Sequence, residues 1–152
     1  MGIAEAAAAR SSCPRLAVGA VLVNPSTKSV LSMGYNGAAR GTASCEDEGC
    51  LMEGRSFAGK TTEHCGRAIH AEQNSIYLAS ANGQRVKGAV CYVTAQPCWL
   101  CARALFQSGV EDVYYSRAYG GELHPLLQDL VSSGDFRLNV CPTGTTPVDP
   151  AE

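Results

Sequence analysis

The sequence predicts an α/β fold of three layers (α/β/α), a mixed sheet of about five strands with helices on both faces. Two observations support this prediction. Short apolar runs typical of strands occur at residues 17–23, 30–35, 89–94, 110–115 and 136–140. After residue 70 these runs alternate with stretches typical of helices, at residues 71–81, 98–107 and 122–131. Strands connected through helices pair in parallel by right-handed crossovers, which places helices over the sheet.

In chain order, a short Ala-rich helix is expected at residues 6–9, and the first two strands should form a hairpin around the turn-forming residues 24–27. Residues 36 to about 62 are rich in Gly, Ser, Cys and acidic side chains and show no sustained period. We expect a loop there, and a loop of that length in a small domain is usually functional or pinned.

Gly and Pro mark the boundaries of the three later helices. Asn82 and Gly83 end the first, Pro97 begins the second, and Pro125 lies in the first turn of the third. The 152 residues suit one domain, expected over residues 1–141. The remaining stretch, 142–152, has three prolines and little apolar character, so a disordered tail is expected.

The charge balance disfavours two classes of partner. Twelve Lys and Arg residues against fourteen Asp and Glu residues leave a net charge of −2. Proteins that bind nucleic acid or anionic membranes usually have a basic excess, so neither partner is expected. No apolar run reaches the roughly eighteen residues of a membrane span, and the first residues do not resemble a secretion signal. A cytoplasmic protein is expected.

Two short motifs predict a metal centre. His70-Ala71-Glu72 opens one helix, and Pro97-Cys98-Trp99-Leu100-Cys101 opens the next. Cys98 and Cys101 project from one face of one turn, at a helix N-terminus that favours thiolates. Three ligands, His70, Cys98 and Cys101, leave the fourth tetrahedral position of a zinc ion for water, as in catalytic sites. Glu72 is then placed to shuttle protons.

Each motif alone has a simpler interpretation. A lone His at a helix start is usually a cap or a surface residue, and a lone C-x-x-C is a redox pair or half of a zinc ribbon. Together, H-x-E followed by P-C-x-x-C is the general signature of zinc nucleobase deaminases.

Over about residues 10–135 the chain resembles the deoxycytidylate (dCMP) deaminase family of the cytidine deaminase superfamily. Besides the two metal motifs, the resemblance rests on three segments: Arg10-Ser11-Ser12-Cys13 with Val18-Gly19-Ala20, Gly34-Tyr35-Asn36-Gly37, and Tyr92-Val93-Thr94. It implies the cytidine-deaminase-like fold and a zinc hydrolase that converts dCMP to dUMP and ammonia for thymidylate synthesis. The N-terminal helix is shorter than in relatives with a longer lead before the R-S-x-C segment.

The resemblance also implies roles for individual residues. His70, Cys98 and Cys101 hold the catalytic zinc, and Glu72 is the catalytic proton shuttle. Asn36 contacts the sugar hydroxyl, and the backbone N–H of Ala71 binds the pyrimidine oxygen. Tyr119 or Arg117 contacts substrate at the rim, although core or rim packing is an equal alternative. Relatives form homo-oligomers, often hexamers, and many respond to dCTP and dTTP as effectors, for which Mg is a further expected cofactor.

Four more cysteines, Cys13, Cys45, Cys50 and Cys65, are expected to form a second, structural zinc site, with His64 as the substitute ligand. Relatives carry such a site in the same region, and the alternative is that these are free or partly buried thiols. The substrate phosphate needs cationic or N–H donors. The candidates are Arg40, Lys60, Arg67, Arg103 and Arg117, and the sequence does not choose among them.

Two alternatives to dCMP deamination stay open. One is a deaminase of another substrate, such as a modified dCMP, cytidine or tRNA adenosine, although the acidic balance disfavours RNA. The other is an inactive zinc-stabilised binding module, in which a proton shuttle such as Glu72 need not persist.

Overall fold

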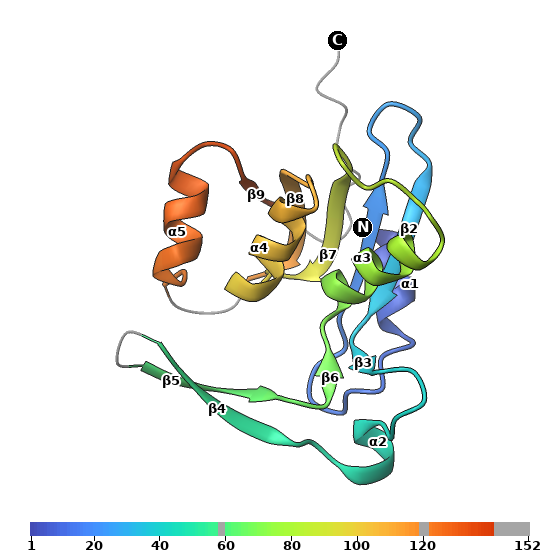
Figure 1. Ribbon diagram of the computed structural model, residues 1–152, viewed down its shortest axis with the longest axis vertical. Helices are drawn as coiled ribbons and strands as arrows, with labels where there is room; N and C mark the ends of the chain where they lie inside the picture. Colours follow the sequence, from blue (N-terminus) through green and yellow to red (C-terminus); the bar gives the residue numbers. More distant parts are fainter. Residues whose placement is uncertain (58–59, 119–121, 142–152) are drawn as a thin grey trace.

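The computed structural model describes residues 1–57, 60–118 and 122–141. Its centre is a five-stranded sheet in the order β2-β1-β7-β8-β9 (Figure 1). The strands are β1 (Gly19–Val23), β2 (Val30–Tyr35), β7 (Val90–Ala95), β8 (Asp112–Arg117) and β9 (Arg137–Val140). β1 runs antiparallel to both β2 and β7, whereas β7, β8 and β9 are parallel. The predicted mixed five-stranded sheet is confirmed.

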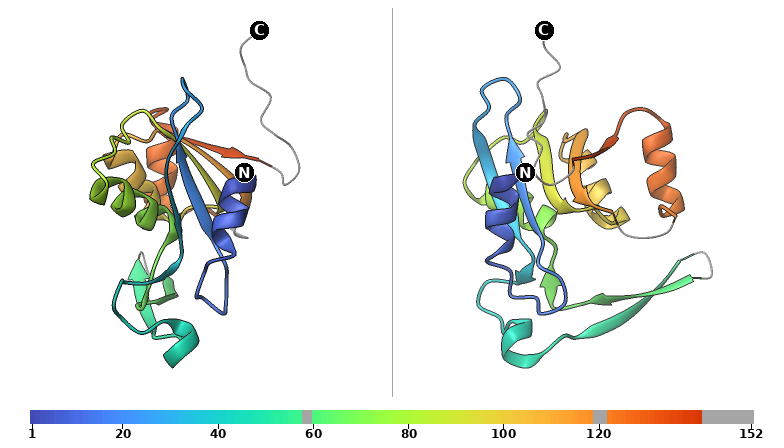
Figure 2. Two further views of the ribbon diagram at one scale, coloured as in Figure 1. Left: turned by 90° about the vertical axis from the view of Figure 1, so that its right-hand side faces the viewer. Right: turned by 180° about the vertical axis from the view of Figure 1, so that it is seen from behind.

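Helices cover both faces of this sheet, so the three-layer prediction is also confirmed. Figure 2 shows α3 (Ala71–Ala81), α4 (Trp99–Gln107) and α5 (Pro125–Ser132) on one face and α1 (Gly2–Ala8) on the other. Leu22, Cys91, Val93 and Leu105 are fully buried between the sheet and α3 and α4. Burial of these strand residues against apolar helix residues such as Leu105 holds the two helix N-termini at one end of the sheet.

The prediction of a loop from residue 36 to about 62 was wrong in part, because the chain forms further helices and strands there. They are β3 (Gly37–Ala38), α2 (Cys45–Glu48), β4 (Met52–Phe57), β5 (Lys60–Cys65) and β6 (Ala68–Ile69). β4 and β5 pair antiparallel in a hairpin that projects from the body of the domain (Figures 1 and 2). A projecting hairpin needs no apolar face, so its polar sequence lacks the period-2 hydrophobic pattern that predicts strands.

Some boundaries differ from expectation. α1 begins at Gly2 rather than at Ala6, and α5 begins at Pro125, three residues later than expected. Tyr119 and the tail at 142–152 lie outside the described residues, so both predictions stay untested. Within the described ranges, no helix combines the length and apolar character that crossing a membrane would require.

Candidate active site and metal centre

The three predicted catalytic-zinc ligands meet where α3 and α4 begin. His70 is the N-cap residue of α3, Cys98 is the N-cap residue of α4, and Cys101 lies in the first turn of α4. The Nδ1 atom of His70 lies 3.6 Å from the Cys98 Sγ and 3.3 Å from the Cys101 Sγ. All three ligand atoms lie within 4.8 Å of one another. Tetrahedral zinc with bonds of about 2.0–2.3 Å needs ligand atoms about 3.5 Å apart, so this donor set fits a zinc ion.

The two cysteines of this group differ in their proton affinity. The pKa of Cys98 falls to about 4, because the Cys101 thiol donates a hydrogen bond to it and His70 lies beside it, which together outweigh its burial. The same hydrogen bond and burial raise the pKa of Cys101. Cys98 is therefore a thiolate at neutral pH, and the thiolate is the form that binds a metal.

Glu72 is a buried carboxyl beside this group. It lies in the first turn of α3, is 4% exposed, and lines the same cleft as His70 and Cys98. Burial, and then the charge of Cys98, raises the pKa of Glu72 to about 7. A pKa near the working pH is what a group that both takes and gives protons requires.

The cleft has a volume of about 570 Å³, within the usual range for small-molecule sites. Ala71 and Asn36, both predicted to touch substrate, line it. The Asn36 side chain is already engaged: its Oδ1 accepts from the Val18 N–H at 2.8 Å and from the Ser11 hydroxyl at 2.6 Å, and its Nδ2 donates to the Leu16 carbonyl at 2.7 Å. Asn36 therefore fixes the segment before β1, and its substrate contact stays a prediction.

The described phosphate candidates lie elsewhere. Arg67 is paired with Glu48 at 3.2 Å, and Arg117 donates to the Ala17 carbonyl at 3.3 Å. Neither they nor Arg40 and Arg103 line the cleft, and the Lys60 side chain falls outside the described part of the structure. The cleft is instead lined by Arg15, which the sequence reasoning missed. The sequence signal that pointed to Arg15 as a cleft residue was its position two residues after the R-S-S-C segment.

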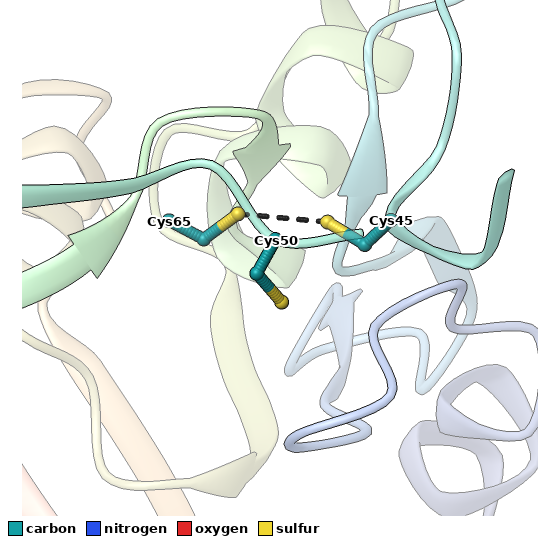
Figure 3. A group of neighbouring side chains, drawn as sticks. All are labelled: Cys45, Cys50 and Cys65. Carbon is teal, nitrogen blue, oxygen red and sulfur yellow. Dashed lines mark hydrogen bonds between the residues drawn. The ribbon is translucent and has the colours of Figure 1, made fainter. Parts of the chain in front are cut away.

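A second thiol group lies at the base of the β4–β5 hairpin (Figure 3). The Sγ atoms of Cys45, Cys50 and Cys65 lie within 4.8 Å of one another, and those of Cys45 and Cys65 are 3.5 Å apart. The structure does not bring Cys13 into this group, although Cys13 and His64 line the same cleft as Cys65. Three of the four predicted ligands are thus together, and the fourth ligand stays a prediction.

The thiols of this second group are also polarised. Burial opposes ionisation of Cys65, but backbone N–H groups of Ala68, Arg67 and Leu51 and the Cys45 thiol donate to it, and its pKa falls to about 7. Burial and the hydrogen bond to Cys65 raise the pKa of Cys45 to about 12. A thiol that ionises near neutral pH, within reach of two others, is a donor set that suits a thiophilic ion such as zinc.

One contact next to the catalytic ligands was not anticipated. The half-buried ring of His124 stacks on Trp99 with centroids 5.9 Å apart. Its Nδ1 also accepts from the Leu126 N–H at 3.3 Å, which caps α5. Trp99 directly follows Cys98, so this stack supports the first turn of α4.

The fold and the site define a class of protein. A mixed sheet with His and Glu at the start of one helix and a Cys pair at the start of the next is the arrangement of the cytidine-deaminase-like fold. The family model described as "Cytidine and deoxycytidylate deaminase zinc-binding region" matches residues 1–117. The chain belongs to this family.

Individual relatives agree with this membership. ComE operon protein 2 of Bacillus subtilis is 43% identical over 81% of this chain and 59% of its own length. The deoxycytidylate deaminase of Mycobacterium phage D29 is 38% identical over 77% of this chain and 91% of its own length. The deoxycytidylate deaminase of Schizosaccharomyces pombe is 36% identical over 82% of this chain and 38% of its own length. The chain thus spans 59% and 38% of the Bacillus and Schizosaccharomyces proteins.

A solved structure shows the same fold with nucleotides bound. The dCMP deaminase of the cyanophage S-TIM5, crystallised with dCMP and dUMP, superposes with a TM-score of 0.69 at 25% identity over 92% of each chain. Its apo form gives a TM-score of 0.67 at 26% identity over the same shares.

Proposed function

We propose that this chain catalyses the zinc-dependent hydrolytic deamination of dCMP to dUMP, with release of ammonia, and so supplies dUMP for thymidylate synthesis. One observation carries the proposal: His70, Cys98 and Cys101 converge within 4.8 Å in a cleft that also holds the buried carboxyl of Glu72. The resemblance to named deoxycytidylate deaminases at 36% and 38% identity supports the choice of substrate.

His70, Cys98 and Cys101 would hold the zinc, which when bound supplies the Lewis acidity that makes water a nucleophile near neutral pH. Glu72 does the proton work. Its carboxylate takes a proton from the attacking water and gives it to N3 of the cytosine, and it then carries the second proton of the same water to the departing amine. With its pKa raised to about 7, Glu72 exists in both protonation states at neutral pH.

Ala71 positions the base. It is the first residue of α3, and the first N–H groups of a helix have no partner within the helix. This N–H is therefore available to donate to the pyrimidine O2, beside the carboxyl that handles N3. Asn36 would offer its remaining amide hydrogen to the sugar hydroxyl.

We propose a second, closed zinc site on Cys45, Cys50 and Cys65, with Cys13 or His64 as the fourth ligand. The lowered pKa of Cys65 and the distance of 3.5 Å between the Sγ atoms of Cys45 and Cys65 support this site. Its role would be structural: α2 has four residues and the β4–β5 hairpin projects from the domain, so neither buries enough apolar surface to be stable alone.

The resemblance extends the proposal to assembly and regulation. We expect a cytoplasmic homo-oligomer, on the pattern of the family's hexamers, that responds to dCTP and dTTP with Mg. Exposed apolar side chains on the edge strand β2 (Met33 and Tyr35) and on α3 (Tyr77 and Leu78) are candidates for burial by a second copy of the chain.

The test is a substrate panel that reads ammonia release from dCMP, 5-substituted dCMP, deoxycytidine, cytidine, dCTP and tRNA, with and without dCTP as effector. Turnover of dCMP above the others, abolished in Glu72→Gln, supports the proposal. Preference for another member of the panel reassigns the substrate. No ammonia from any member, in protein that carries zinc, favours the inactive binding module.

A further inference from the structure

Two aromatic rings join the helix that carries the cysteine ligands to the next helix along the chain. The ring of Trp99, in the first turn of α4, stacks on the ring of His124, the N-cap residue of α5. Their centroids lie 5.9 Å apart and their planes differ by 3°. Both residues are half-buried, and neither lines the catalytic cleft. The stack thus lies one residue from the metal ligand Cys98 but outside the space that a substrate would occupy.

Trp99 belongs to the same helical turn as both sulfur ligands. It lies between the N-cap residue Cys98 and the first-turn residue Cys101, and its ring packs against the buried core. Helix ends fray, because their first N–H groups have no partner within the helix. A contact that anchors Trp99 therefore acts on the part of α4 that its own hydrogen bonds constrain least, and that part carries both thiols.

The His124 side of the stack is held by its own helix. The His124 Nδ1 accepts a hydrogen bond from the Leu126 N–H at 3.3 Å, which fixes the ring over the start of α5. Pro125 follows with a restricted φ angle, and Leu127, 2% exposed, anchors this turn in the core. α5 lies beside α4 on the same face of the sheet and packs against it (Figure 1). Trp99 thus stacks on a ring whose position is set independently.

We propose that His124 is a positioning residue of the metal centre: its ring, through Trp99, holds the first turn of α4 in the form that binds a metal ion. This rests on the zinc site of the proposed function. Without the stack, the metal-free turn would populate other arrangements, and metal binding would have to order it again. The affinity for the ion would fall by the fraction of molecules whose turn is not already in the binding form.

Two substitutions separate the ring of His124 from its capping atom. His124→Asn removes the ring but keeps a side-chain oxygen that can cap α5. His124→Phe keeps a flat ring for Trp99 but removes the acceptor for the Leu126 N–H. The matched control is Tyr114→Leu, which breaks the stacked pair of Tyr92 and Tyr114, whose centroids are 5.2 Å apart. Neither tyrosine lines the cleft.

The measurement is occupancy of the site as a function of free zinc, whose concentration a chelator buffers. Occupancy is read as protection of Cys98 from alkylation, located by mass spectrometry, so the thiols of the second site do not contribute. Because an aromatic pair is worth about 0.5–1.5 kcal/mol, we expect His124→Asn to need about two- to tenfold more free zinc for half protection. His124→Phe and Tyr114→Leu should keep the wild-type midpoint.

The outcomes distinguish the ring from the cap and from general destabilisation. A wild-type midpoint in His124→Asn overturns the inference. An equal rise in His124→Phe assigns the effect to the cap of α5, and an equal rise in Tyr114→Leu assigns it to lost stability, so either result also overturns it. If circular dichroism shows that His124→Asn does not fold, Trp99→Leu removes the same stack and should give the same rise.

The zinc measurement requires no turnover, so it is separate from the test of the proposed function. If the protein deaminates nothing but shows the expected midpoints, only the proposed reaction fails. If it deaminates dCMP while His124→Asn keeps the wild-type midpoint, only the positioning role of His124 fails.

Discussion

Gly34 of β2 is the position where a single methyl group should disturb the catalytic helix. A Cβ atom built on Gly34 would meet the Ala71 carbonyl oxygen and the Ser75 nitrogen of α3 closer than 3.0 Å, and the Asn74 carbonyl carbon at 2.9 Å. These are backbone atoms, so no side-chain rotation relieves the overlap. Gly34→Ala must therefore move α3, which carries Glu72 and begins after His70.

The expected size of the effect follows from this geometry. Overpacking costs about 1–3 kcal/mol, and we expect the upper end because backbone must shift. About 3 kcal/mol lowers the Tm of a chain of this length by about 6–12 °C. A displacement of about 1 Å at reacting groups costs roughly a hundredfold in rate, so kcat/KM per folded molecule should fall by that factor.

Gly19→Ala is the matched control. Its Cβ would overlap the backbone of α1, at the Ala4 carbonyl oxygen and the Ala8 nitrogen, and α1 contributes no residue to the cleft. It should lower the Tm comparably while activity per folded molecule stays near wild type. The assays are thermal unfolding followed by circular dichroism and steady-state ammonia release, both at saturating zinc. A Gly34→Ala protein with wild-type Tm and kcat/KM would refute the reasoning.

Three further outcomes are expected. Glu72→Gln should retain zinc by elemental analysis while kcat falls by about 10²–10⁴-fold, and near-normal turnover would remove Glu72 from the mechanism. Cys45→Ser should lower the metal content from about two zinc ions per chain to about one, and an unchanged single ion would contradict the second site. Ser44 donates to Asp47 at the start of α2 and lowers the pKa of that carboxyl. These hydrogen bonds stabilise the folded protein above the unfolded-state pKa of Asp47, and the stabilisation is lost as the pH falls through the lower folded-state pKa. Ser44→Ala should raise the folded-state pKa of Asp47, measured by NMR titration. No rise would contradict the assignment.

Local spacing made the catalytic ligands predictable. Cys98 and Cys101 are three residues apart at a helix start, and a strand separates them from the helix that His70 begins. A helical turn and a parallel crossover each have one geometry, so the pattern determines that these groups converge. The same logic predicted the sheet, whose buried strands are apolar because both of their faces are covered.

Tertiary structure alone decided which distant residues share the cleft. Arg15 and Glu72 are far apart in sequence, and no periodicity relates the segment before β1 to the start of α3. The hairpin that brings Cys65 to Cys45 pairs through backbone hydrogen bonds, which any side chains permit, so its polar residues carried no strand signal. Composition and spacing thus determined the metal chemistry of this chain, whereas the close approach of backbone segments determined what surrounds it.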